Sequence, residues 1–112
     1  MIPTVETCEE LFKSGFPQKT ALCAHLTDLL APEYEAEWSH LTQDCLFAAP
    51  VFTEIWDELP RHLTIDRKQC ELKLSKKGIG YYHDTFEKIV KYDPNLAQAA
   101  ARLWLEVKQY FK

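Results

Sequence analysis

The sequence contains no uninterrupted apolar run of about 18 residues, the length that a membrane-spanning helix requires. Its first residues also lack the apolar stretch of a secretory signal, because Glu6, Glu9 and Glu10 occur where that stretch would lie. We therefore expect a cytoplasmic protein with no membrane association.

Closely spaced cysteines are also absent. The four cysteines of the chain are scattered among apolar neighbours at Cys8, Cys23, Cys45 and Cys70. In a reducing compartment this pattern favours small buried thiols. In a secreted protein, the same four residues would allow two disulfides in three alternative pairings.

Cysteine and histidine residues at the sequence spacing of metal-binding or catalytic sites are also rare. Only Cys23 and His25 are close together, and on a helix two residues at this spacing face different sides. The remaining histidines occur on separate expected elements, at His40, His62 and His83. We therefore expect no metal, no cofactor and no enzymatic activity, although a site assembled only in the folded chain would not be visible in this spacing.

Glycine-rich phosphate-binding loops are missing as well. The pair Gly78 and Gly80 lacks the third glycine and the strand-to-helix context of a nucleotide-binding loop, and a hairpin turn accounts for it. Clustered carboxylates are present, but general acid–base work would also need a pocket and perturbed pKa values, which a sequence does not display.

What the chain does contain is enough apolar material for one domain. It has 112 residues, of which 46% are hydrophobic and 12% aromatic, so we expect a single domain over residues 1–112. The net charge of −4 is unevenly distributed. Residues 1–60 hold 2 basic and 11 acidic side chains, whereas residues 61–91 hold 8 basic and 4 acidic ones. Such segregation is typical of a charged interaction surface, and also of two ordinary solvated faces.

Residues 1–60 are predicted to be mainly helical. Thr4 is a suitable cap for a first helix that ends near Gly15. A second helix is predicted between Pro17 and Pro32, and a third from Glu33 to Cys45. The predictions of the second and third helices rest on the helical spacing of the apolar residues Leu22, Leu26, Leu29, Leu30, Tyr34, Trp38 and Leu41. A short fourth helix is predicted from Phe52 to Leu59.

After Pro60 the apolar period changes from helical to strand-like. Strands are predicted over residues 62–65, 70–74 and 79–83, with a turn over 75–78. In the second strand, Cys70, Leu72 and Leu74 are expected to share one face. Residues 84–92 fit either a helix or a strand, and we favour a fourth strand because a larger sheet gives the last helix more to cover.

Residues 93–112 are predicted to form one amphipathic helix, capped by Asp93 with Pro94 in its first turn. The predicted fold class is therefore α+β. Helices come first, followed by an antiparallel β-meander of 3–4 strands over residues 61–92 and by a C-terminal helix packed on the sheet.

Three segments carry a resemblance to a known group of proteins. The runs from Ala49 to Pro60 ("AP…LP") and from Asp93 to Leu105 ("NLA.A.A.L"), together with a hairpin ending in Gly80-Tyr81-Tyr82, resemble small uncharacterised proteins of phages and prophages. The resemblance covers the second half of the chain. It implies a phage or mobile-element origin and carries no known activity or site residues.

The leading functional hypothesis is a non-enzymatic accessory protein that binds a partner protein through its acidic helical half. Clustered carboxylates steer association with a basic surface, as a phage inhibitor, an anti-CRISPR or another anti-defence protein, or an immunity protein would require. The candidate residues are Glu33, Glu35, Glu37, Asp57 and Glu58.

Two alternatives accompany this hypothesis. The basic hairpin region could hold phosphates and stack nucleic-acid bases. Its candidate residues are Arg67, Lys68, Lys73, Lys76, Lys77 and Tyr81, with Arg61 and Tyr82 nearby. The other alternative is a domain with no defined site. An uncovered aromatic stripe involving Trp38, Trp56 or Tyr110 would also allow a homodimer.

Overall fold

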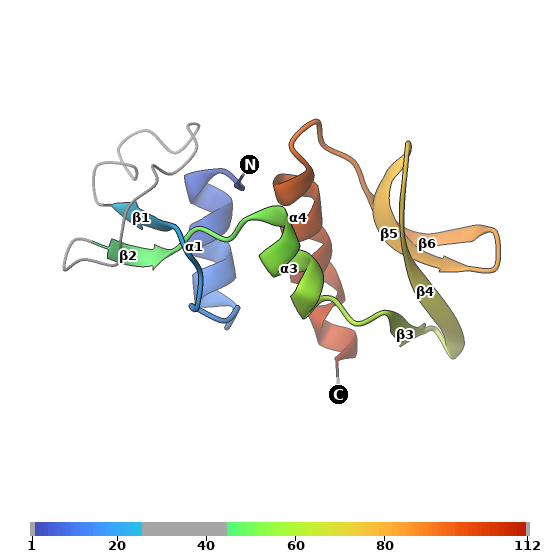
Figure 1. Ribbon diagram of the computed structural model, residues 1–112. Helices are drawn as coiled ribbons and strands as arrows, with labels where there is room; N and C mark the ends of the chain where they lie inside the picture. Colours follow the sequence, from blue (N-terminus) through green and yellow to red (C-terminus); the bar gives the residue numbers. More distant parts are fainter. Residues whose placement is uncertain (1, 26–44, 112) are drawn as a thin grey trace.

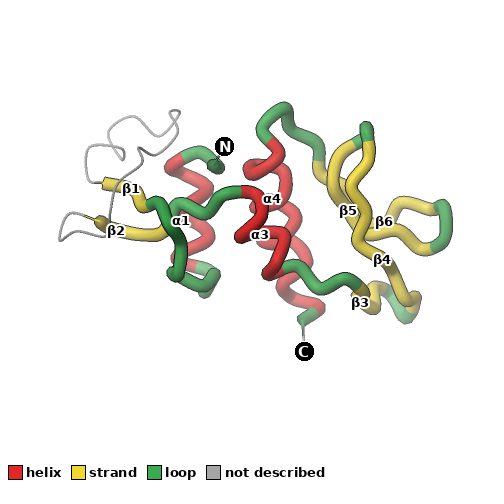
Figure 2. Tube along the Cα trace, viewed as in Figure 1, coloured by secondary structure: helices red, strands yellow, loops and turns green. Residues whose placement is uncertain are grey.

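The computed structural model describes residues 2–25 and 45–111, and in this part of the chain helices and antiparallel sheets are arranged as an α+β fold (Figure 1). The predicted fold class is confirmed. Figure 2 shows the chain in the same view with helices, strands and loops distinguished. The elements are α1 (Val5–Lys13), β1 (Cys23–His25), β2 (Cys45–Ala48), α3 (Phe52–Glu58), β3 (His62–Ile65), β4 (Lys68–Ser75), β5 (Gly78–His83), β6 (Phe86–Lys91), α4 (Leu96–Val107) and the 3₁₀ helix η1 (Lys108–Tyr110).

The larger sheet is an antiparallel meander in the order β3-β4-β5-β6. Asp66 and Arg67 join β3 to β4 with φ angles of 51° and 65°, the left-handed pair that a tight hairpin turn requires. Gly78 has φ 122° after the next turn, where a Cβ would lie 2.2 Å from the Lys91 carbonyl oxygen. Residues 84–92 contain β6, so the predicted fourth strand is confirmed.

Helix α4 lies between the sheet and the N-terminal helix α1 (Figure 1). Its alanines Ala97, Ala99, Ala100 and Ala101 are completely buried, which allows close packing on several sides. The helix is shorter than predicted. Asn95 caps it by accepting a hydrogen bond from the Gln98 amide, while the Asp93 carboxylate binds the Asn95 amide at 2.8 Å, so Asp93 fixes the approach to the helix.

The predicted first helix is confirmed as α1, with Thr4 as its N-cap. Buried Gln98 joins α1 to α4. Its side-chain oxygen accepts from the Thr4 amide at 2.9 Å, and its side-chain nitrogen donates to the Thr7 hydroxyl at 2.7 Å. The short helix before Pro60 is also confirmed, as α3.

The second and third predicted helices are wrong where the structure describes them. Residues 23–25 and 45–48 form the antiparallel strands β1 and β2, which contain a register shift between Ala24 and His25. The leucine spacing that favoured helices is a local signal, and pairing between distant segments overrides such signals. Cys23 is disulfide-bonded, which departs from the expectation of four buried thiols. The remainder of these two predicted helices lies outside the described residues.

The face prediction for β4 is only partly correct. Cys70 and Leu72 are buried in the core cluster that also contains the α4 residues, but Leu74 is 47% exposed. Leu74 instead lines a surface hollow together with Lys73, Lys76 and Lys77.

Candidate functional site

The first strand of the meander, β3, is an edge of the sheet. Ile65 and Lys68 flank a two-residue turn, and residues in that position form a hydrogen-bonded pair. The next hydrogen-bonded positions of β3 are therefore Leu63 and Arg61, and the Arg61 carbonyl accepts from the Leu72 amide at 2.9 Å. The backbone N–H and C=O groups of His62 and Thr64 consequently point away from β4.

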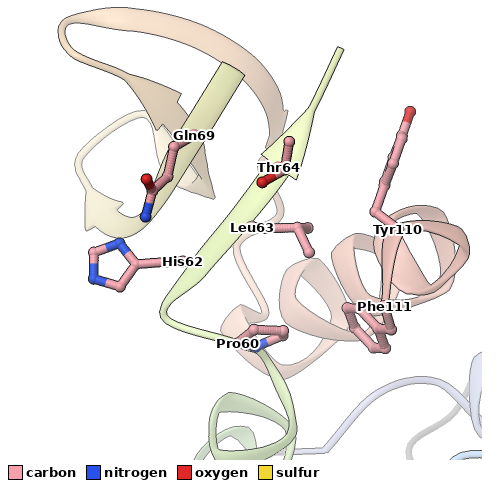
Figure 3. Close-up of a pocket in the computed structure, with 7 residues that line it drawn as sticks. All are labelled: Pro60, His62, Leu63, Thr64, Gln69, Tyr110 and Phe111. Carbon is pink, nitrogen blue, oxygen red and sulfur yellow. The ribbon is translucent and has the colours of Figure 1, made fainter. Parts of the chain in front are cut away.

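A groove runs along this open edge (Figure 3). It encloses about 470 Å³ and is lined by Pro60, His62, Leu63, Thr64, Gln69, Tyr110 and Phe111. Figure 3 shows Leu63 directed toward the end of the C-terminal helix, whereas His62 and Gln69 lie on the opposite side of the strand. One wall of the groove is therefore a strand edge, and the other carries two aromatic rings.

The aromatic wall is formed by the residues that follow α4. The chain tightens into η1 after Val107, and η1 contacts β3. Phe111 packs edge-to-face on Trp104, with ring centroids 6.1 Å apart, and its amide donates to the Lys108 carbonyl. This packing holds Phe111 in place, while Tyr110 remains partly exposed.

The floor of the groove is held by a residue of β5 that lies on the same face of the sheet as Leu63. Tyr81 is completely buried, and its hydroxyl donates to the Pro60 carbonyl at 2.6 Å. Burial raises the pKa of the Tyr81 phenol well above its usual value of 10.0, so this donor keeps its proton. The structure therefore assigns Tyr81 a positioning role at the bend between α3 and β3. It cannot stack on a nucleic-acid base in this fold.

The predicted acidic site is described only in part. Asp57 and Glu58 are exposed in the last turn of α3, where the helix dipole disfavours carboxylates. Asp57 lines a small hollow together with Arg61 and Glu71. Glu33, Glu35 and Glu37 lie outside the described residues.

The predicted basic residues fall into two separate groups. Lys73, Lys76 and Lys77 line a shallow hollow of about 670 Å³ on the sheet face that α4 leaves uncovered. Lys73 lies 5.8 Å from the centroid of the Tyr82 ring, a cation–π distance, and Lys77 forms an ion pair with Glu87 at 3.7 Å. The second group, Arg67 and Lys68, lies at the turn between β3 and β4, next to the groove.

Among residues 2–25 and 45–111, no group of three or more histidine, cysteine, aspartate and glutamate side chains could hold a metal ion. Cys8 and Cys70 are both buried, in different packing clusters. The groove itself was missed by the sequence reasoning. Its only signal was Tyr110, one of three aromatic residues named for an uncovered stripe, and nothing local connected this residue to β3.

In the same described ranges, no helix combines the length and apolar character needed to cross a bilayer. Comparisons of the chain with protein-family models, with curated proteins and with solved structures find no match. The resemblance to phage and prophage proteins therefore stays a prediction.

Proposed function

We propose that this protein is a non-enzymatic binding module that takes up a segment of a partner protein in the groove beside β3. The observation that carries the proposal is the position of the groove, which places an open strand edge opposite two aromatic rings. Tyrosine and phenylalanine are enriched at the centres of protein interfaces, where their rings bury a large area. The partner-binding hypothesis is thus kept, but its site moves from the acidic helical half to the β3 edge.

The test begins with short random peptides displayed for selection on the full chain. The affinity of each selected peptide is then measured by fluorescence anisotropy. We expect Tyr110→Ala to weaken binding about tenfold or more, because it removes one wall of the groove. Tyr92→Ala is the matched control, since Tyr92 is 70% exposed and does not line the groove, and it should leave the affinity unchanged.

Two results would overturn the proposal. One is a selection that yields no binding peptide. The other is a set of peptides that bind the wild type, Tyr110→Ala and Phe111→Ala equally well, because binding would then occur elsewhere on the surface.

Nucleic-acid binding is the second candidate function. The Lys73–Tyr82 contact favours it, since a cation beside an aromatic ring can engage a phosphate and a base together. Glu71, Asp84 and Glu87 on or beside the same face count against it. Salt-dependent retardation of single-stranded DNA or RNA that is lost in Lys76→Glu/Lys77→Glu would support this function, and no retardation at low salt would exclude it.

The role of an inhibitor, anti-defence protein or immunity protein would follow from the identity of the bound partner. A phage or mobile-element origin is part of the same prediction. Neither is needed for the groove to bind a peptide.

A further inference from the structure

We infer that the groove binds an extended, acidic segment of the partner, which adds to the sheet as a fifth strand beside β3. This inference rests on the proposed function and specifies the chemistry of the bound segment. It follows from three features of the β3 edge, namely its backbone groups, its two side-chain faces and its flanking charges.

The backbone groups favour a strand over a helix. His62 and Thr64 each direct one N–H donor and one C=O acceptor into the groove, about 6.6 Å apart along the strand. A bound helix satisfies its own backbone groups internally and would bury these four groups without partners. An extended segment pairs with all of them, because main-chain groups in a strand recur at the same interval.

The side chains on the two faces of β3 predict an alternating sequence. Residues directly opposite each other on paired strands project to the same face of a sheet. A residue opposite Leu63 would therefore direct its side chain between Leu63 and the rings of Tyr110 and Phe111, which favours an apolar residue there. Its two neighbours would project to the side of His62 and Thr64, which favours polar residues.

The flanking charges favour acidic residues in the segment. Arg67 and Lys68 are exposed at the turn that closes one end of β3, and within the described residues no ion pair engages either of them. Asp66 offsets part of their charge, and Arg61 at the other end of β3 shares its hollow with Asp57 and Glu71. The turn end is therefore the more cationic end of the groove, and a carboxylate next to it gains electrostatic attraction.

The same charges disfavour a second copy of the chain as the occupant. Antiparallel pairing of two β3 strands would bring Arg61 of one copy toward the turn of the other, where the single carboxylate of Asp66 offsets only part of the charge of Arg67 and Lys68, and like charges at an interface repel each other. The acidic segment is therefore assigned to a different protein.

A substitution at Thr64 tests the strand geometry. Thr64→Pro removes an N–H that points away from β4, so it leaves the sheet intact, because proline is tolerated on an edge strand in that orientation. Thr64→Val keeps the N–H and removes only the hydroxyl. For the peptides selected above, we expect binding to weaken about tenfold in Thr64→Pro and to change by less than about twofold in Thr64→Val. Unfolding in urea verifies that both variants are folded.

The charge component is tested with two matched double variants. Arg67→Glu/Lys68→Glu should weaken binding of the same peptides at low salt. Lys76→Glu/Lys77→Glu introduces the same charge change at the turn between β4 and β5 and should leave binding unchanged.

Backbone methylation of the peptides tests the strand pairing. N-methylation on the side that pairs with β3 should abolish binding, and methylation on the opposite side should not.

The results separate this inference from the proposed function. Binding that depends on Tyr110 but is unaffected by Thr64→Pro and by N-methylation would leave a binding module and overturn strand addition. Selected peptides without acidic residues, or binding that is insensitive to Arg67→Glu/Lys68→Glu, would overturn the acidic segment. A wild-type dimer in sedimentation that Thr64→Pro converts to a monomer would assign the edge to a second copy and overturn the foreign partner.

Discussion

The two edge strands of the sheet, β3 and β6, differ in how their open sides are protected. On the β6 side, the pairing with β5 is interrupted by an irregularity between Tyr81 and Tyr82, which leaves Lys88 as an extra residue. Lys91 is also drawn toward α4 by an ion pair with Glu106 at 2.5 Å. Bulges and lysines are the devices by which natural sheets prevent an edge from pairing with another chain. The β3–β4 pairing contains no such irregularity.

The position of α4 accounts for part of this difference. The helix packs against β5 and β6, while the short η1 packs against β3. The sheet is therefore supported under β6 and left with a groove beside β3. A fold of this kind can bind an extended segment on one side without aggregating on the other.

The largest expected effect comes from the close approach of β5 and β6. A Cβ on Gly80 would lie 2.3 Å from the Ile89 carbonyl oxygen and 2.7 Å from Val90 Cα, both of which are backbone atoms. We expect Gly80→Ala to lower the free energy of unfolding by about 3 kcal/mol, because the β6 backbone must shift to relieve the contact. Urea unfolding followed by circular dichroism measures this loss.

The comparison for Gly80→Ala is Thr64→Ala on β3, whose side chain lies at the exposed edge. That substitution should cost no more than about 0.5 kcal/mol. Equal losses for the two variants would show that β6 is no more tightly constrained than β3.

A smaller effect is expected at the hydrogen bond that positions the groove. Tyr81→Phe removes the donor to the Pro60 carbonyl and should cost about 1 kcal/mol. It should also weaken peptide binding, since Pro60 lines the groove, whereas the β6 edge should be unaffected. Backbone amide exchange, measured separately for β3 and β6, would locate the change.

The raised pKa of Tyr81 adds a pH dependence to the same test. The folded state retains the phenol proton at pH values where the unfolded chain has lost it. The contribution of Tyr81 to stability is therefore constant below about pH 10 and declines as the pH rises from there toward the folded-state pKa. The stability difference between wild type and Tyr81→Phe should shrink over that range. A difference that stays constant above pH 10 would contradict the burial of this hydroxyl.

The second half of the chain could be predicted from sequence because its signals are local. Cys70 and Leu72 alternate with Glu71 and Lys73, and Gly78 follows the next turn. The sequence therefore predicted β4, β5 and the turn between them. In contrast, β1 and β2 are three and four residues long and are separated by 19 residues of sequence. Short strands of this kind carry too few residues to establish a period.

The groove could not be predicted for a related reason. Its two walls come from β3 and from residues 110–111, which are separated by most of the sheet and by α4. The predicted helix ran to Lys112, and a continuous helix would not have formed the same wall. The change to η1 after Val107 depends on tertiary packing, including the contact of Phe111 with Trp104.

The smallest expected effect concerns the ion pairs on the β6 side. Lys91 and Glu106 are 33% and 42% exposed, so solvent screens their pair, and Lys91→Met should cost only about 0.5 kcal/mol. Lys77→Met is the matched control, because the Lys77–Glu87 pair is longer, at 3.7 Å, and Lys77 is 79% exposed. The cost of Lys91→Met should decrease as salt is raised, since screening weakens the pair that is lost.

If Lys91→Met also allows the chain to associate through β6, which would be detected by sedimentation, then the charge of Lys91 is what keeps this edge unpaired. If the variant stays monomeric, the irregularity between Tyr81 and Tyr82 is sufficient by itself, and the asymmetry between the two edges arises from backbone geometry.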